Sequence, residues 1–414
     1  MEIKLIFLSI FLFNGHVIPK PIELPNESNA IGTPCSTNSK TAWLNIILII
    51  DTSTNMGASR LRQLTLSLSS ELSTFTISQG NTRFTSRVAI ITYADTANQV
   101  AHLTTYANIT QIQQALFSIN VSSSSSVAGL VNAADYAVRM ISDAYGENDQ
   151  RISVPVLFSS SLNGLDTNIA DFVDNIQYLT GQNLITINYN QSNAILTSDL
   201  NQWAADSFNF TNDAKVYQNL KWALLQANCY CESAQLTFRD PKTGRLERYA
   251  DCGLMTEWLD IDQNMTVLSL CEGDAPFAIT SQAKFDFIQY HDYLDVDSFY
   301  IGLHRNAQKH WVWWDYSLKE FPLGNFTAWA SGFNSSSTGD CVYGESATGD
   351  NTSPYLWKTG SCYPYLSDIA ITVCQHRACD ADYDWESNKH GCGLPEKRNE
   401  KIKKVVKHGK KDLK

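Results

Sequence analysis

The sequence lacks the features that mark most enzymes. Its 414 residues contain no Gly-x-Ser-x-Gly, no His-Glu-x-x-His and no glycine-rich phosphate loop, so the common motifs of serine hydrolases, zinc peptidases and nucleotide-binding enzymes are absent. Charged residues are also scarce, at 18%, whereas hydrophobic residues reach 43%. This composition is typical of folded domains, and we expect a protein that is not an enzyme.

Long apolar runs are missing after the amino terminus, so no transmembrane segment is expected, because a spanning helix needs about 20 apolar residues. Residues 5–13 form a short apolar run that follows Lys4. A basic residue before such a run is typical of a signal peptide. We therefore expect residues 1–19 to be a signal peptide and the protein to be secreted into the extracellular space. A short buried strand is the alternative interpretation of this run.

Basic residues are concentrated at the carboxyl end of an otherwise acidic chain. The net charge is -11, and residues 396–414 hold nine Lys or Arg against three Asp or Glu, so this segment carries +6 and the remainder carries -17. An acidic body argues against nucleic acid as a partner, because phosphate contacts need Lys and Arg on the folded surface. We expect residues 377–414 to be a cysteine-containing and then basic, disordered tail. Binding of the tail to anionic glycans or membrane surfaces is the alternative.

Ten cysteines and nine glycosylation sequons agree with export. Cysteines of an exported chain normally form disulfides, and the even count leaves no obligatory free thiol. The sequons predict glycosylated asparagines at the surface of a secreted protein. The sequon asparagines are Asn26, Asn108, Asn120, Asn190, Asn209, Asn264, Asn325, Asn334 and Asn351.

The length suggests more than one domain, and residues 42–227 have the pattern of an α/β fold. Short β-branched runs at 43–50, 88–93, 154–158 and 184–187 are expected to be buried strands. Stretches with helical spacing of apolar residues lie at 61–77, 109–119, 127–145, 169–179 and 214–226. Alternation of this kind predicts a doubly wound parallel sheet with helices on both faces.

Asp51, Ser53 and Asn55 directly follow the first expected strand, at the sheet edge where open α/β folds bind ligands. Their short oxygen-bearing side chains, at alternate positions, suit a hard cation such as Mg²⁺. This segment resembles the von Willebrand factor type A domain, whose metal-ion-dependent adhesion site opens with Asp-x-Ser-x-Ser. The resemblance covers residues 35–229.

Carried over by residue, the resemblance assigns Asp51 and Ser53 to the cation site, with Asn55 in place of its last serine and Ser124 in place of a threonine. Ser160 stands near the position of a further aspartate, so that carboxylate is missing. With one anionic ligand the site should bind a divalent cation, Mg²⁺ or Ca²⁺, only weakly. The alternative is that Asp51 and Ser53 accept hydrogen bonds from loop N–H groups. A role for Asp51 as a phosphatase nucleophile is not expected, because such enzymes carry another Asp where Ser53 stands.

Residues 230–376 have a different character, with dense cysteines and short aromatic-rich segments. One helix is expected within 277–290, followed by strand-like segments at 299–303, 311–315, 326–332 and 371–375. In this order the segments resemble a C-type lectin-like domain, with 299–303 at its core strand and 371–375 at its last strand. The match, over residues 231–376, implies a disulfide-rich α+β fold. It implies the pairs Cys35–Cys229, Cys231–Cys252, Cys271–Cys374, Cys341–Cys362 and Cys379–Cys392.

The calcium site of that family is largely missing here. Where the family has Glu-Pro-Asn and Trp-Asn-Asp, this sequence has 332–334, Gly-Phe-Asn, and 357–359, Trp-Lys-Thr. Lys358 would repel a cation, so calcium-dependent sugar binding is not expected. The polar loop at 344–356 is the expected contact surface, although tryptophans of this unit are more often core than sugar platforms. The candidate ligand-binding residues are Asn334, Glu345, Asp350, Asn351 and Trp357.

The order of the two parts resembles secreted, nematode-type C-type lectin-like proteins. The resemblance implies an extracellular recognition or adhesion protein that binds carbohydrate or protein ligands, with a role in innate defence. The alternative is a structural component of the extracellular matrix whose two ligand sites have degenerated.

Overall fold

The computed structural model describes residues 31–80, 82–146, 151–165, 169–231, 233–258, 262–289, 296–348, 353–367 and 369–382. The expected signal peptide, most of the expected tail, and the candidate residues Asp350, Asn351 and Cys392 lie outside these ranges. No helix among the described residues is both long and apolar enough to span a membrane.

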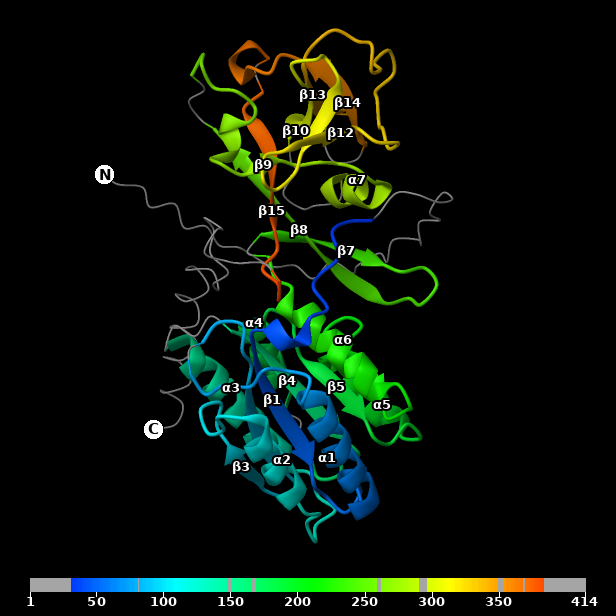
Figure 1. Ribbon diagram of the computed structural model, residues 1–414. Coiled ribbons are helices and arrows are strands. Elements are labelled where there is room, and N and C mark those ends of the chain that lie inside the picture. The colour runs from blue at the N-terminus through cyan, green and yellow to red at the C-terminus, as the bar shows by residue number, and fades with distance from the viewer. Residues whose placement is uncertain are drawn as a thin grey trace, which may run out of the picture.

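A six-stranded sheet forms the centre of the first unit, residues 39–229 (Figure 1). Its strand order is β3-β2-β1-β4-β5-β6, and every neighbouring pair is parallel except β2 with β3. The strands are β1 (Leu44–Asp51), β2 (Arg87–Tyr93), β3 (Ala97–Ala101), β4 (Ile152–Ser159), β5 (Ile185–Asn188) and β6 (Asn209–Thr211).

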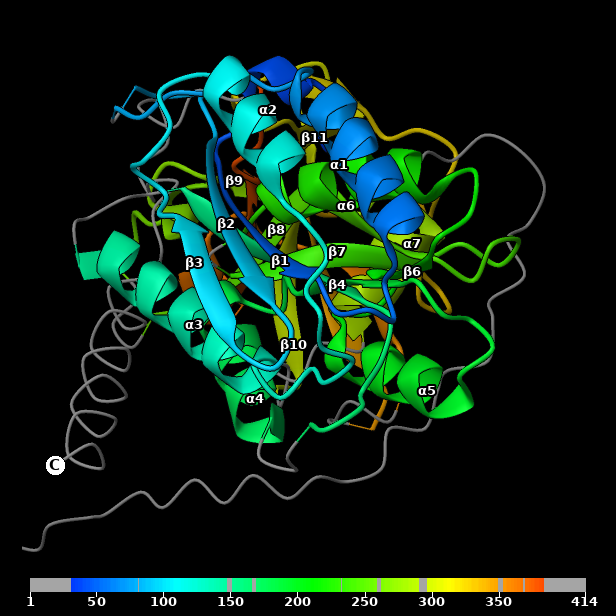
Figure 2. The ribbon, with the colours of Figure 1, turned by 90° about the horizontal axis from the view of Figure 1, so that it is seen from below.

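Helices cover both faces of this sheet, as Figure 2 shows. They are α1 (Ala58–Leu72), α2 (Ile109–Ser118), α3 (Leu130–Gly146), α4 (Ile169–Thr180), α5 (Ala194–Trp203) and α6 (Val216–Asn228). Ile46 and Leu48 of β1 pack in one core with α1, α2 and α6, whereas Ile47 and Ile49 pack in the other with α3, α4 and α5. Strand β1 is buried on both faces, which explains its unbroken apolar run. The expected doubly wound fold is confirmed.

Four details of the first unit differ from the expectation, and one of them is the short strand β6, which was not expected. Helix α1 ends at Leu72 instead of residue 77, because Ser73 and the residues after it leave the helix and Ile77 bridges to Ser86. Strand β3 was not expected, since four of its five residues are exposed or only partly buried and two of them, Asn98 and Gln99, are polar. Helix α5 was missed as well, although Leu196, Leu200 and Trp203 have helical spacing and the side chain of Asn193 caps its first turn.

The second unit, residues 230–382, is built on a mixed nine-stranded sheet. Its main path is β12-β11-β10-β15-β8-β7; β13 pairs with β10 and β14, and β9 pairs with β15. The strands are β7 (Ala234–Arg239), β8 (Leu246–Glu257), β9 (Ala275–Pro276), β10 (Ser298–Arg305), β11 (Trp311–Trp314), β12 (Glu320–Pro322), β13 (Cys341–Ser346), β14 (Tyr355–Gly360) and β15 (Ile371–Arg377).

One helix, α7 (Gln282–Gln289), packs against this sheet among the described residues. It is shorter than the expected 277–290, because the backbone N–H of Phe277 donates to the carbonyl of Val373 and continues the sheet. The expected segment at 326–332 forms no named strand, and Trp329 makes an isolated bridge to Trp357. The sheet, helix α7 and the disulfides together give the expected disulfide-rich α+β unit.

Four disulfides join cysteines of the described residues, and they are four of the five pairs that the resemblance implies. They are Cys35–Cys229, Cys231–Cys252, Cys271–Cys374 and Cys341–Cys362. Cys379 is also disulfide-bonded, and its expected partner Cys392 lies outside the described residues. Two of the bridges, with Ala250 and Ala378, form a small core at the junction of the two units.

The hairpin of β7 and β8 contacts the first unit through three arginines. Arg239 pairs with Asp206. The guanidinium of Arg245 lies 4.1 Å from the ring centre of Trp222 on α6, and Arg248 donates to Asn183 Oδ1 over 2.8 Å. Cation–π and charged hydrogen-bond contacts of this kind fix orientation as well as adding attraction. The hairpin therefore holds the second unit against the α5–α6 side of the first.

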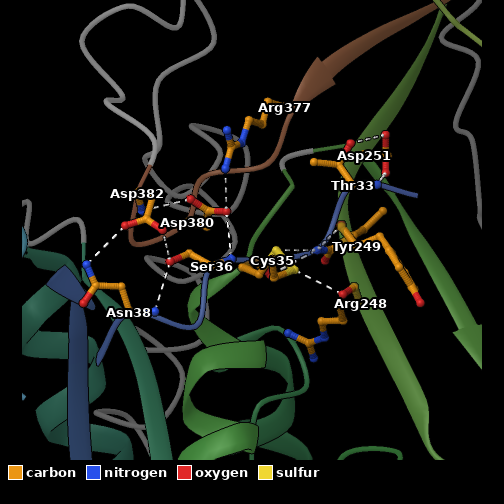
Figure 3. A network of polar contacts seen from close by, with 12 residues as sticks. Thr33, Cys35, Ser36, Asn38, Arg248, Tyr249, Asp251, Arg377, Asp380 and Asp382 are labelled. Atoms are coloured by element: carbon orange, nitrogen blue, oxygen red, sulfur yellow. Dashed lines mark hydrogen bonds and ion pairs between the residues drawn. A yellow bond between two sulfur atoms is a disulfide. The ribbon is translucent and has the colours of Figure 1, made fainter. Parts of the chain in front are cut away.

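The segment before β1 lies between the two units (Figure 3). Thr33 donates its backbone N–H to Asp251 Oδ2 on β8 over 2.5 Å, and the same buried carboxylate pairs with Lys284 Nζ at 2.8 Å. Further along, the N–H of Ser36 donates to Asp380 Oδ2 over 3.1 Å. Asn38 donates its side-chain amide to Asp382. The segment thus contacts both β8 and the residues after β15 before it enters the first sheet.

Two of the four disulfides between described residues, Cys35–Cys229 and Cys341–Cys362, close loops of very different length and should contribute differently to stability. Cys35–Cys229 spans 194 residues and Cys341–Cys362 spans 21; the unfolded chain loses more entropy with the longer loop, about 5 against about 3 kcal/mol. We expect Cys35→Ser/Cys229→Ser to lower the free energy of unfolding by about 2 kcal/mol more than Cys341→Ser/Cys362→Ser, measured by denaturant titration. Equal losses would contradict this order.

Candidate functional site

The side chain of Asp51 lies at the end of β1, fully buried, at the sheet edge that the sequence indicates. Its Oδ1 accepts a hydrogen bond from the N–H of Ser53 over 2.8 Å. Its Oδ2 accepts two from Ser160, one from the N–H at 2.9 Å and one from the hydroxyl at 2.6 Å. Both carboxylate oxygens are therefore paired with protein donors. A buried carboxylate in this state is not placed to attack a substrate.

Tyr93 lies beside Asp51 on the neighbouring strand. Its hydroxyl donates to the carbonyl of Phe158 over 3.0 Å. Burial, and after it the nearby charge of Asp51, raises the pKa of Tyr93 well above the ordinary value of 10.0. Tyr93 is therefore a neutral hydrogen-bond donor at any physiological pH, and it holds the end of β4 next to Asp51.

The other candidate cation ligands lie in the same group of loops, but the polar atoms of Asn55 and Ser124 are hydrogen-bonded to the loop backbone. Asn55 donates its amide to the carbonyl of Ser125 over 2.7 Å. Ser124 Oγ accepts from the N–H of Ser126 over 3.1 Å. Ser53 Oγ is buried and has no hydrogen-bond partner among the described residues. The structure thus brings Asp51, Ser53, Asn55 and Ser124 to one edge, where the side chains of Asp51, Asn55 and Ser124 are hydrogen-bonded to loop backbone.

These residues do not fit a divalent cation. Asp51 is the single carboxylate of the set, and the hydroxyl of Ser160 occupies one of its oxygens. Among the described residues no three His, Cys, Asp or Glu side chains gather as metal ligands would. Mg²⁺ gives up its hydration shell reluctantly and is held through carboxylates. The N–H and the hydroxyl of Ser160 already occupy Oδ2 of Asp51, so this carboxylate is largely paired within the protein.

In the second unit Trp357 was wrongly placed on the contact surface. The side chain has no exposed area, and it packs edge-on against Trp313 and Trp329, with ring centres 5.7 and 5.6 Å apart. Side chains alternate between the two faces of β14, and Trp357 lies on the inner face with Tyr355. The same alternation places Lys358 on the outer face.

Lys358 and Glu345 form an ion pair across β13 and β14, with Nζ 2.7 Å from Oε1. Both side chains are partly exposed, so the pair adds little stability, but it gives the carboxylate of Glu345, a candidate ligand-binding residue, a partner within the protein. The ammonium of Lys358 also lies 6.0 Å from the ring centre of Phe333. Asn334, next to Phe333, is exposed and accepts a hydrogen bond from the N–H of Ser336. Asn334 and Glu345 therefore lie on neighbouring segments.

An exposed apolar segment was missed. Tyr363, Tyr365 and Leu366 are 47%, 53% and 71% exposed, in and beside the short helix η3 (Pro364–Leu366). The backbone before them is fixed, because Cys362 is bridged to Cys341, its carbonyl accepts from the N–H of Val267, and Tyr300 donates to the carbonyl of Ser361. The sequence feature that could have indicated this exposed segment is the run Tyr-Pro-Tyr-Leu directly after Cys362.

The sequon asparagines differ in access. Asn108, Asn120, Asn264, Asn325 and Asn334 are exposed, whereas Asn190 and Asn209 are partly buried. Asn209 lies in β6, and its side chain accepts from Thr186 and donates to Asn201. Asn26 and Asn351 lie outside the described residues. The exposed asparagines are the better acceptors for a glycan.

Comparison with known proteins identifies the first unit. Residues 45–227 match the family model of the von Willebrand factor type A domain, and this part of the chain is a type A domain.

One curated protein is similar to this chain over most of its length. C-type lectin domain-containing protein 160 of Caenorhabditis elegans is 25% identical over 370 residues, which cover 84% of this chain and 55% of the relative. The chain thus spans about half the length of that relative.

Similarities to solved structures are weaker. Proximal thread matrix protein 1 from the mussel byssus, with a zinc-occupied MIDAS motif, is 15% identical with a TM-score of 0.36, over 45% of this chain and 47% of the other. A von Willebrand factor type A structure from Catenulispora acidiphila is 14% identical with a TM-score of 0.33, over 47% and 44%.

Trp357 is buried and Tyr365 is exposed, so truncating the two side chains should change the free energy of unfolding by very different amounts. Trp357→Ala should leave a cavity in the core and lower the free energy of unfolding by about 3–5 kcal/mol. Tyr365→Ala removes a side chain that is 53% exposed, so its effect should stay within about 0.5 kcal/mol. Denaturant titration followed by circular dichroism measures both. Similar losses for the two variants would place Trp357 outside the core.

Proposed function

We propose that the protein is a secreted extracellular recognition protein, which binds glycan or protein ligands through surface loops and performs no catalysis. Its units are a type A domain at residues 35–229 and a C-type lectin-like domain at residues 230–376. The setting we propose is innate defence, which rests on the resemblance of the two-part order to secreted, nematode-type C-type lectin-like proteins.

The observation that carries this proposal is the rigid aromatic segment at 363–366. Two tyrosines and a leucine stand exposed on a backbone that a disulfide, a proline and two hydrogen bonds hold in place. Ordering a side chain on binding costs entropy, and a fixed backbone lowers that cost. Tyrosine is common at recognition surfaces because it combines a large apolar ring with a polar hydroxyl.

Binding without a calcium ion is the mode that the outer face of β13 and β14 supports. Lys358 stands where the family of C-type lectin-like domains has a cation ligand, and it is paired with Glu345. Ligand contact would then come from exposed rings and from Asn334, with no divalent cation between protein and ligand.

Absence of catalysis is supported by the state of the buried polar groups. Asp51 is fully buried and hydrogen-bonded through both oxygens. Asp251, a second fully buried carboxylate, is paired with Lys284 and accepts from Thr33 and Tyr316. Neither carboxylate has the open access that a general base or nucleophile needs.

A glycan array and capture of extracellular proteins on the immobilised full-length protein test this function. The double variant Tyr363→Ser/Tyr365→Ser should weaken binding about tenfold or more, since two aromatic anchors are removed. Ile195→Ser is the matched control, because it removes an apolar side chain that is 70% exposed on the type A domain, and it should leave binding unchanged. Chelator should have no effect.

Two results would contradict the proposal. Binding that the double tyrosine variant leaves intact would remove the aromatic segment from the recognition surface. Absence of any glycan or protein ligand, together with self-assembly of the purified protein, would favour a structural component of the extracellular matrix.

A further inference from the structure

We propose that Ser160 takes over the structural role of a divalent cation in the type A domain. The hydrogen bonds between Ser160 and Asp51 hold the loops of the ligand edge together, and the domain keeps this edge ordered in the absence of any cation. The inference concerns the first unit alone and does not depend on what the second unit binds.

The first step is the pairing of a buried charge. Asp51 has no exposed area, and leaving a carboxylate in the interior without partners costs several kcal/mol. Two donors of Ser160 and the N–H of Ser53 point at its two oxygens, at 2.6 to 2.9 Å. Three donors, one of them a short hydroxyl bond, stabilise the charged form of a carboxylate. The protein's own hydrogen-bond donors therefore compensate the buried negative charge of Asp51.

The second step is that the three loops of this edge are joined to each other by direct hydrogen bonds. The loop after β1 donates from the N–H of Thr54 to the carbonyl of Ser124, and accepts at the carbonyl of Thr52 from the N–H of Ser122. Asn163, in the loop after β4, donates its amide to the carbonyl of Ser125 and accepts from the N–H of Val127. A bound cation would make the same connections through its ligands, so here it is not needed.

The third step is the unused hydroxyl of Ser53. Its Oγ is buried and has no partner among the described residues, although the N–H of the same residue is bonded to Asp51. One oxygen ligand of a cation site therefore remains beside Asp51, while the second carboxylate is replaced by a hydroxyl. A carboxylate at position 160 would face Asp51 directly, and the two like charges would need a cation between them.

The experiment compares the full-length protein with four variants, in chelator and in millimolar Mg²⁺ or Ca²⁺, by thermal unfolding and by titration calorimetry. The native protein should have the same melting temperature in every buffer and give no heat of cation binding. Ser160→Ala should melt several degrees lower in all buffers alike, because it removes the hydroxyl bond to Asp51.

Ser160→Asp should make the melting temperature depend on the divalent cation. In chelator it should melt below the native protein, because two carboxylates are buried side by side. Cation should raise its melting temperature by about 5 °C or more, as expected for a ligand well above its dissociation constant. Ser123→Asp is the matched control: it adds the same charge to an exposed position of the adjacent loop and should show no response to cation.

Two outcomes would overturn the inference. One is a rise in the melting temperature of the native protein with cation that Asp51→Asn abolishes. The other is a Ser160→Ala variant as stable as the native protein. These two tests hold even if Ser160→Asp does not fold.

Discussion

The disulfide between Cys35 and Cys229 lies where the two units meet, and the arrangement of the rest of the molecule depends on it. It joins the segment before β1 to the end of α6, so the first strand and the last helix of the type A domain start and finish at the same place. A second bridge, Cys231–Cys252, packs beside it. Because both bridges share one small core, the hairpin of β7 and β8 is held against the first unit, and its arginines find their partners there.

This junction also decides which surfaces remain free. The type A domain contacts the second unit at the side where β1 begins, and Asp51 stands at the other end of that strand (Figure 1). In the second unit, β13 and β14 lie at the end of the molecule away from the type A domain (Figure 1). The two candidate ligand surfaces therefore face away from each other, and a ligand at one end leaves the other accessible.

The sequence predicts best where a single physical requirement acts along a segment. Strand β1 is apolar without interruption because both of its faces are buried, and residue 51 is polar because it ends the strand at the sheet edge. Strand β3 escaped prediction because most of its residues are exposed or only partly buried. The expected helix at 277–290 began too early, because Phe277 pairs instead with Val373 of the distant strand β15. Trp357 was misplaced for a similar reason: whether a tryptophan of a strand faces in or out depends on register, which neighbouring residues in the sequence do not fix.

In each unit a carboxylate of the candidate site is paired with another group of the protein. Asp51 in the type A domain is paired with the hydroxyl of Ser160, and Glu345 in the second unit is paired with the ammonium of Lys358. The partners suit their surroundings: in the fully buried site a neutral donor compensates one charge without bringing in a second that would also lose its hydration. At the partly exposed site a second charge costs little, because water still reaches both groups. The recognition that we propose should therefore follow from the shape and polarity of the loops and not from the local concentration of calcium or magnesium.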